Sequence, residues 1–244
     1  MAEAKIIFKL DLILHLVDTT TGLSVSQSRV TFYVDGMPVK FIKKEDGYYI
    51  LLNYGRKDMQ LEITAEGYET TMIDVVYDQL QDNYPEIDIY LIPLPDKYNH
   101  INLVTLEGIL EDIESIDAIP FNEYVAKVSD YLERKQVLKL FAAKSMEEKK
   151  YAIVHEEQMK FEEFSIKTNI DKFTLMLQNP LKVACKPDEK ISRIVRGQVD
   201  KQGNYLLRVL EDVHGTEYLV RYRVKGTTKY KKIYLSNSEE ILLE

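Results

Sequence analysis

Histidine and cysteine are the side chains best suited to bind a metal or to act in nucleophilic catalysis, and this chain has few of them. Its histidines are His15, His100, His155 and His214, and its single cysteine is Cys185. None of the five lies within metal-ligand spacing of another, so a zinc site would need residues to converge from distant parts of the chain. Small and β-branched neighbours favour a packed Cys185 thiol over a Cys–His nucleophile pair. We expect surface or rim histidines, with no metal site and no nucleophilic centre.

Acidic pairs are the next candidates, because two carboxylates can share acid and base roles or bind calcium. The pairs lie at residues 111–112, 147–148, 156–157 and 162–163. Adjacent residues on a strand point to opposite faces, so such a pair does not form one site, and the Asp-rich pattern of a calcium loop is absent. Solvated faces explain the pairs better.

Sequence motifs for nucleotide binding and for serine hydrolases are also missing. The ten glycines are scattered singly, with no phosphate-cradling loop and no Gly-x-Ser-x-Gly elbow. We predict a protein that is not an enzyme, with no cofactor and no small-molecule substrate. An enzyme whose residues converge from distant strands would leave no local motif, and turnover abolished by one carboxylate or histidine change would overturn this prediction.

Basic and aromatic residues interleave in one segment, residues 221–234. In a hairpin, Arg221, Arg223 and Lys225 would share one face, with Lys229 and Lys231 near them across the turn. Such a patch could bind nucleic acid or an acidic polymer, or its charges could protect an exposed edge from strand addition. Docking on an acidic protein surface fits a chain with a net charge of −8 better than nucleic acid does. The predicted contact surface comprises Arg221, Arg223, Lys225, Lys229, Tyr230, Lys231, Lys232, Tyr48 and Tyr49.

Composition indicates a folded, strand-rich protein. The 244 residues are 45% apolar and 30% charged, with 17 Tyr, 8 Phe and no Trp, and aromatic residues favour strands. A lone cysteine excludes an intrachain disulfide, which fits a reducing compartment. The alternating, charged residues 6–11 do not resemble a signal core, and no run approaches a membrane span. We expect a cytoplasmic protein that does not contact a membrane.

The charge is unevenly spread along the chain. Residues 1–95 hold 8 basic and 15 acidic side chains (net −7), residues 96–190 hold 14 and 18 (net −4), and residues 191–244 hold 10 and 7 (net +3). An acidic head and a basic tail would favour head-to-tail contacts between copies. Solvated faces of both signs are the simpler explanation.

The elements that must position these side chains are strands. Apolar residues alternate through residues 8–16, and six further runs follow at short spacing, as is typical of an antiparallel sandwich. Asp-Gly pairs at 35–36 and 46–47 suit tight hairpins. Prolines 93 and 95 remove backbone donors and end the sheet. We therefore place a β-sandwich over residues 1–95 and a second domain over residues 96–244.

The second domain is predicted to be a β-rich barrel or sandwich with little helix. Residues 109–119 have apolar spacing that suits one or two helical turns, and residues 120–150 fit either state, with strands flanking a short helical piece preferred. Residues 191–199 are expected to pair with residues 204–210. The remaining expected strands are 103–110, 151–154, 161–166, 173–177, 218–224 and 230–235.

The turns of the first domain carry a resemblance. A Thr-Gly turn at 21–22, Asp35-Gly36, Asp46-Gly47-Tyr48-Tyr49 and Glu66-Gly67-Tyr68-Glu69 follow one another in order. This succession resembles the prealbumin-like, Ig-like sandwich of carboxypeptidase regulatory-like domains, over about residues 5–92. The resemblance implies a sandwich used for stability or contact, and it transfers no catalytic residue.

The link after the sandwich carries a second resemblance. Pro93 and Tyr98, followed by a strand from Leu103, are similar to the link in accessory proteins of contractile phage-tail-like particles. The aromatic and proline residues usual after this tyrosine are replaced by Asn99-His100-Ile101. The resemblance implies a part of a particle that can be released without a signal peptide.

We therefore predict a structural component that contacts other protein subunits, copies of itself included, in a phage-tail-like particle such as a contractile injection system or virion. The alternative is a carbohydrate- or peptide-binding module with Tyr48, Tyr49 and Tyr54 as its platform. An assembly part purified alone should associate into polydisperse or ring-like species, whereas a glycan binder should stay monomeric and shift with ligand. Tail sheath, tube or baseplate genes nearby would favour the first prediction.

Overall fold

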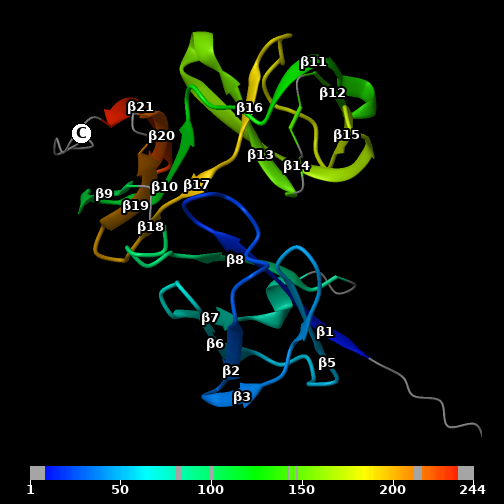
Figure 1. The fold of residues 1–244 in the computed structure, drawn as a ribbon, viewed down its shortest axis with the longest axis vertical. Helices are drawn as coiled ribbons and strands as arrows, with labels where there is room; N and C mark the ends of the chain where they lie inside the picture. The colour runs from blue at the N-terminus through cyan, green and yellow to red at the C-terminus, as the bar shows by residue number, and fades with distance from the viewer. Residues whose placement is uncertain are drawn as a thin grey trace, which may run out of the picture. The chain divides into compact units, whose positions relative to one another are not determined.

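A computed structural model describes residues 9–80, 84–98, 102–141, 143–144, 146, 148–211 and 216–235 (Figure 1). The chain divides into two compact units: unit 1 holds residues 1–19 and 23–99, and unit 2 holds residues 20–22 and 100–244. Regular structure in the described ranges is β, apart from three short 3₁₀ helices: η1 (Tyr77–Gln79), η2 (Glu133–Lys135) and η3 (Glu156–Gln158). The prediction of a mainly β protein with little helix is confirmed.

Unit 1 is a β-sandwich of two four-stranded sheets, ordered β4-β5-β1-β8 and β3-β2-β6-β7. The pairs in both sheets are antiparallel, except that β1 and β8 run parallel. Parallel neighbours need a long crossover, and here the chain builds the other strands of the sandwich before it returns as β8. The strands are β1 (Leu10–Asp18), β2 (Val30–Val34), β3 (Met37–Val39), β4 (Ile42–Lys43), β5 (Tyr48–Leu52), β6 (Met59–Ala65), β7 (Thr71–Val75) and β8 (Glu86–Leu91).

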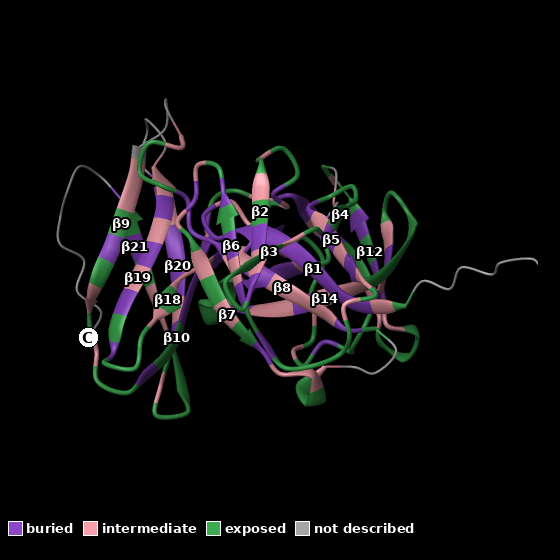
Figure 2. Cartoon of the chain, turned by 90° about the horizontal axis from the view of Figure 1, so that it is seen from below, coloured by how far each residue is buried: buried purple, intermediate pink, exposed green. Residues whose placement is uncertain are grey.

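Alternation along the strands builds the core of unit 1. Leu12 and Leu14 from one sheet and Leu61 and Ile63 from the other are fully buried in one cluster. Strand β1 is buried on both faces, as its purple ribbon in Figure 2 shows. Burial on both faces means that the polar positions of β1 must find partners inside the protein.

Two hairpin turns of unit 1 follow the Asp-Gly prediction. Asp35-Gly36 and Asp46-Gly47 have positive φ at both residues, as two-residue turns of this type require. The single return strand expected over 39–42 is instead split between β3 and β4, which belong to different sheets. The split has a physical cause, because Phe41 lies between them and packs into the core with its ring 4.3 Å from that of Phe32.

Unit 2 contains a closed six-stranded barrel, ordered β11-β12-β15-β14-β13-β16, and two open sheets, ordered β17-β10-β20-β21 and β18-β19-β9. The prediction was a β-rich barrel or a sandwich, and unit 2 contains a barrel together with two open sheets that pack on a shared core. The strands are β9 (Asn102–Ile109), β10 (Ile113–Pro120), β11 (Ala126–Leu132), β12 (Val137–Phe141), β13 (Lys150–His155), β14 (Lys160–Asp171), β15 (Thr174–Leu177), β16 (Lys190–Ser192), β17 (Val195–Arg196), β18 (Gln198–Val199), β19 (Asn204–Glu211), β20 (Thr216–Val224) and β21 (Thr227–Leu235).

The barrel is an insertion between two strands of an open sheet. The chain leaves β10 at Pro120, forms the barrel and returns at Val195 in β17, which pairs with β10. A cluster that includes Ile119, Phe161 and Leu219 packs barrel residues against β10 and β20. The barrel and the open sheets therefore share buried contacts within unit 2.

Two predictions for unit 2 are wrong. Residues 113–120 form a strand and not helical turns. The prediction failed because β10 is covered on both faces, so its run of buried residues lacks the apolar–polar alternation that identifies a strand. Residues 191–199 do not form one hairpin strand, since they divide among β16, β17 and β18, and only β18 pairs with β19. Strands flanking a short helical piece do occur within 120–150, as β11, η2 and β12.

Candidate functional site

The basic segment forms the predicted hairpin, with β20 and β21 antiparallel around a two-residue turn. Lys225 and Gly226 in this turn have φ of 48° and 74°. A turn of this type fixes the register of both strands, and directly opposite residues then share a face. The register therefore decides which cations lie together.

The register divides the basic residues between the two faces of the hairpin. Lys229 lies opposite Tyr222, which is the neighbour of Arg221 and Arg223 in β20 and so points to the other face. Lys231 shares the face of Lys229. The expectation that all these cations lie together is wrong. The two-residue turn pairs Arg221 with Tyr230 and Arg223 with Thr228, so Lys229 and Lys231 point to the opposite face.

Cations on and near the arginine face have acidic partners. The ion pairs are Arg223–Glu114 at 2.8 Å, Lys225–Asp112 at 3.1 Å and Lys232–Glu217 at 3.0 Å. The hydrogen bond from Lys232 lowers the pKa of the Glu217 carboxyl. Tyr230 is turned inward, and its hydroxyl donates to the Phe161 carbonyl oxygen at 3.1 Å. Pairing of this kind cancels much of the positive potential that a polyanion would need.

Arg221 belongs to a ring of four charges. The Asp117 carboxylate, 7% exposed, accepts from Arg196 Nη1 at 3.1 Å and from Arg221 Nη2 at 2.6 Å. Glu163 closes the ring, with Oε1 at 2.7 Å from Arg196 Nη2 and Oε2 at 3.6 Å from Arg221 Nη2. The ring joins barrel strand β14 to β10, β17 and β20, so Arg221 holds the parts of unit 2 together.

Tyr48 and Tyr49 do not form a common surface. Tyr49 is 4% exposed and packs in the core, with its ring 5.0 Å from that of Phe32. Tyr48 points to the opposite face, as successive residues of a strand do, and stacks on the His15 ring at 4.4 Å and 9°. The predicted aromatic platform of Tyr48, Tyr49 and Tyr54 is therefore wrong.

A row of polar side chains crosses the sheet beneath Tyr48. Strand register places His15 beside Tyr48 of β5 on one side and Asp88 of β8 on the other. His15 is 4% exposed, with Nδ1 at 3.0 Å from Asp88 Oδ1 and Nε2 at 2.8 Å from Ser24 Oγ. No local motif in the sequence marks this set, because Ser24 and Asp88 lie 9 and 73 residues from His15.

Backbone contacts fix Ser24 beside the end of β1. Ser24 forms an isolated bridge with Val17, and the next amide, of Val25, donates to the Leu16 carbonyl oxygen at 2.8 Å. The turn at Gly47 packs closely against this segment, since a Cβ at position 47 would lie 2.9 Å from Leu16 O and 3.2 Å from Ser24 Cβ. Only glycine permits this approach, so the turn holds Ser24 against β1.

His155 and Cys185 are the remaining histidine and cysteine of the described residues. His155 is 3% exposed with Nδ1 at 2.8 Å from Glu189 Oε1, so His15 and His155 are buried rather than at the surface or rim. Burial raises the pKa of the Cys185 thiol, and Glu189 adds to this rise. His100 and His214 lie outside the described residues. Within the described part of the chain, no group of His, Cys, Asp and Glu is placed to hold a metal ion.

Both residues of the link resemblance are tied to unit 1. The buried Asp18 carboxylate accepts hydrogen bonds from the Tyr68 hydroxyl, at 2.9 Å, and from the Tyr98 hydroxyl. Burial raises the pKa of Tyr68, and the charge of Asp18 raises it further. Pro93 forms a backbone bridge with Tyr68. The chain is therefore anchored to the sandwich up to Tyr98.

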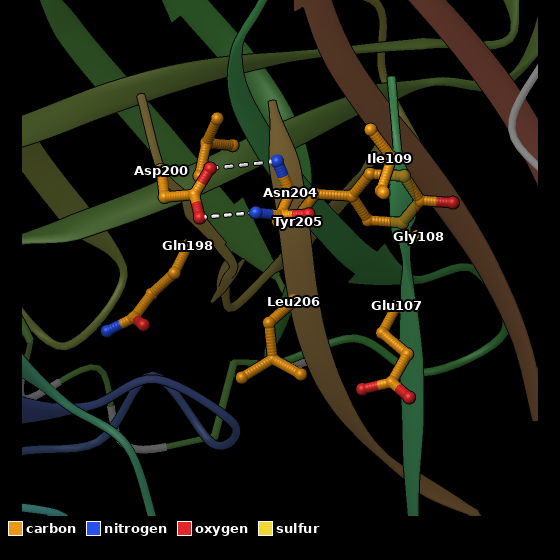
Figure 3. A pocket seen from close by; sticks show the side chains of 9 residues that line it. Glu107, Gly108, Ile109, Gln198, Asp200, Asn204, Tyr205 and Leu206 are labelled. Atoms are coloured by element: carbon orange, nitrogen blue, oxygen red, sulfur yellow. Dashed lines mark hydrogen bonds between the residues drawn. The ribbon is translucent and has the colours of Figure 1, made fainter. Parts of the chain in front are cut away.

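An open groove of about 680 Å³ lies over the sheet β18-β19-β9 (Figure 3). Register places Gln198, Leu206 and Glu107 in one row across the three strands. At the end of the groove, Asp200 accepts hydrogen bonds from the Asn204 backbone, at 2.9 Å, and side chain, at 2.6 Å. The groove thus has an apolar centre at Leu206, flanked by an amide and a carboxylate.

Strand β9 forms one wall of the groove and is the edge of its sheet. Ile109, at the end of β9, is 77% exposed. The Tyr205 ring crosses β9 at Gly108 on the buried face, where a Cβ at position 108 would lie 2.6 Å from the phenol oxygen. Among the described residues, no strand pairs with the outer side of β9.

Comparisons with known proteins give no family. No protein-family description and no curated protein matches this chain. Among solved structures, the chain is similar to a chimeric titin Z1Z2-Z1Z2 tandem functionalized with a GRGDS exogenous peptide from fibronectin. That match has 7% identity and a TM-score of 0.17, and it covers 93% of this chain and 97% of the titin chain. A likeness at this TM-score bears on neither fold nor function.

No helix in the described ranges is long and apolar enough to cross a membrane.

Proposed function

We propose that this chain is a structural component of a protein assembly and that it binds a neighbouring subunit by adding that subunit's strand to the edge of β9. The observation that carries this proposal is Ile109, a large apolar side chain that is 77% exposed on an eight-residue edge strand beside a groove. Long apolar edges are uncommon in monomeric proteins, because they invite pairing with another chain.

Among the edge strands β3, β4, β21 and β9, length and charge favour β9 as the docking edge. Edges β3 and β4 are three and two residues long, which protects them by shortness. Edge β21 has nine residues, but it carries Lys229, Lys231 and Lys232, and lysine is a usual protection against strand addition. Strand β9 has only Glu107 among its eight residues as a charge. Of these edges, β9 is the long one without protection.

The groove indicates what the partner segment should be. Backbone hydrogen bonds to β9 would supply affinity, and side chains that alternate along the added strand would supply specificity. An apolar side chain would cover Leu206 and Ile109, and a basic one would pair with Glu107. The partner we infer is an extended segment with a basic and an apolar residue two positions apart, because Glu107 and Ile109 share one face of β9.

We further infer that the assembly is a phage-tail-like particle, such as a contractile injection system or virion. The support for this inference is the resemblance of the link at Pro93 and Tyr98. The uneven charge, from −7 over residues 1–95 to +3 over residues 191–244, supports contacts between copies as well.

Co-expression with the products of neighbouring genes tests the proposal. The Ile109→Asp variant places a charge on the exposed end of β9 and is expected to lower recovery of the partner at least tenfold. Ile170→Asp is the matched control, because Ile170 is 53% exposed on barrel strand β14. Equal recovery with both variants would contradict the β9 site, and the absence of any particle gene nearby would contradict the particle.

A further inference from the structure

We propose that the Ser24 hydroxyl is an activated nucleophile that accepts an acyl group from an ester, with His15 as its general base and Asp88 as the residue that orients the imidazole. The contacts are Ser24 Oγ to His15 Nε2 at 2.8 Å and His15 Nδ1 to Asp88 Oδ1 at 3.0 Å. A serine, histidine and aspartate in this order of contacts are the constellation that activates serine on several unrelated folds. The inference does not depend on the proposed assembly role.

The direction of each hydrogen bond follows from the chemistry of the groups. An ionised carboxylate can only accept, so Asp88 requires the proton on His15 Nδ1. The neutral imidazole then has a lone pair at Nε2, which can only accept, and Ser24 must donate its hydroxyl proton there. This arrangement is the tautomer that a general base needs, because Nε2 is ready to take the proton as Ser24 Oγ attacks.

Packing holds the three groups in place. The His15 side chain is 5% exposed and that of Asp88 is 19% exposed, so their interaction is only weakly screened by water. Tyr48 stacks on one side of the imidazole and restricts its tilt. Ser24, at the other end of this row, is half-buried, so it keeps some exposure to solvent.

The acylation transfers the acyl group of the ester to Ser24 and releases the alcohol. Ser24 Oγ attacks the ester carbonyl carbon and forms a C–O bond while its proton passes to His15 Nε2. The tetrahedral intermediate then breaks its bond to the alkoxy group, which leaves as the alcohol after it takes the proton from Nε2. The products are acyl-Ser24 and the free alcohol, and no oxidant, reductant or metal takes part.

Acetylation by p-nitrophenyl acetate tests this proposal on the full chain. Intact mass and peptide mapping give the rate at each serine, and the segment contains its own controls, because Ser26 and Ser28 lie two and four residues from Ser24. We expect Ser24 to react about 100-fold faster than Ser26 or more, which is within the range of general-base catalysis. The Ser26→Ala variant is expected to keep the full rate at Ser24.

Variants of the other two groups distinguish activation from mere exposure. Asp88→Asn keeps the shape of the side chain and His15→Gln removes the base, and each is expected to lower acetylation of Ser24 about 100-fold. Circular dichroism and melting curves identify a variant that fails to fold. If His15→Gln fails to fold, the acetylation rate of Ser24 in Asp88→Asn alone tests the proposal. Acetylation of Ser24 at the rate of Ser26, or an unchanged rate in a folded Asp88→Asn protein, would overturn the proposal.

Discussion

Replacement of Asp117 by asparagine should destabilise unit 2 far more than loss of a similar surface carboxylate. Asp117 is 7% exposed and accepts from both Arg196 and Arg221. Asparagine keeps the volume but removes the charge, so of the two carboxylates in the ring only Glu163 would remain for two arginines whose side chains are 16% and 21% exposed. Removal of one partner from a buried ion pair leaves an uncompensated charge.

The expected magnitude follows from burial. Loss of one partner from a fully buried pair costs about 3–5 kcal/mol. The arginines here retain some contact with water and keep Glu163, so we expect a smaller cost of about 2–3 kcal/mol for Asp117→Asn, below that range. At roughly 2–4 °C per kcal/mol for a domain of this size, the melting temperature should fall by roughly 4–12 °C.

A matched control lies on the same two strands. Arg223 of β20 pairs with Glu114 of β10 at 2.8 Å, but these side chains are 53% and 44% exposed. Exposed pairs contribute about 0–1 kcal/mol, so Glu114→Gln should hardly change the melting temperature. Calorimetry of the full chain is the suitable assay, since the sequence has no Trp to report unfolding by fluorescence. Equal shifts for the two variants would refute the reasoning from burial.

Three further predictions concern glycine packing, a buried phenol and the link. Gly108→Ala places a methyl against the Tyr205 ring and should cost about 1–3 kcal/mol in denaturant titrations, whereas the same change in a Tyr205→Leu background should cost less. Burial raises the pKa of Tyr77 from 10.0 to about 12. The neutral phenol therefore contributes its full share of the folding stability below pH 10, and this share is lost as the pH rises to about 12. Tyr77→Phe should reduce the fall of the melting temperature between pH 10 and about 12, and equal slopes for the variant and the unchanged protein would contradict the raised pKa of Tyr77. Asp18→Asn weakens the acceptor for Tyr98 and should cost about 1–3 kcal/mol, so an unchanged unfolding curve would show that this bond does not anchor the link.

Local rules were sufficient for the fold class and for most strands. Asp35-Gly36 and Asp46-Gly47 could be predicted as turns because an Asp-Gly pair satisfies a need for positive φ that lies within two residues. The helical interpretation of residues 109–119 failed because β10 is covered on both faces, which removes the alternation that identifies a strand. The division of residues 191–199 among three sheets depends on where β10, β13 and β19 lie, and no local pattern carries that information.

The candidate sites were less predictable than the strands. The register of β20 and β21 puts Lys229 on the face opposite Arg221, and an error of one residue in that register reverses every side chain. The contacts of His15 with Ser24 and Asp88 needed the parallel pairing of β1 with β8, which joins segments far apart in the sequence. Sites of this kind arise from topology, so the motifs searched for in the sequence could not reveal them.

Hydrogen exchange at the amides of β9 tests the central claim most directly. The measurement compares the isolated chain with the same chain in complex with the subunit recovered by co-expression, and β7 (Thr71–Val75), an edge strand of unit 1, serves as the internal control. Addition of a partner strand should slow exchange in Asn102–Ile109 at least tenfold and leave β7 unchanged. Unchanged exchange in β9 within a formed complex would contradict the account.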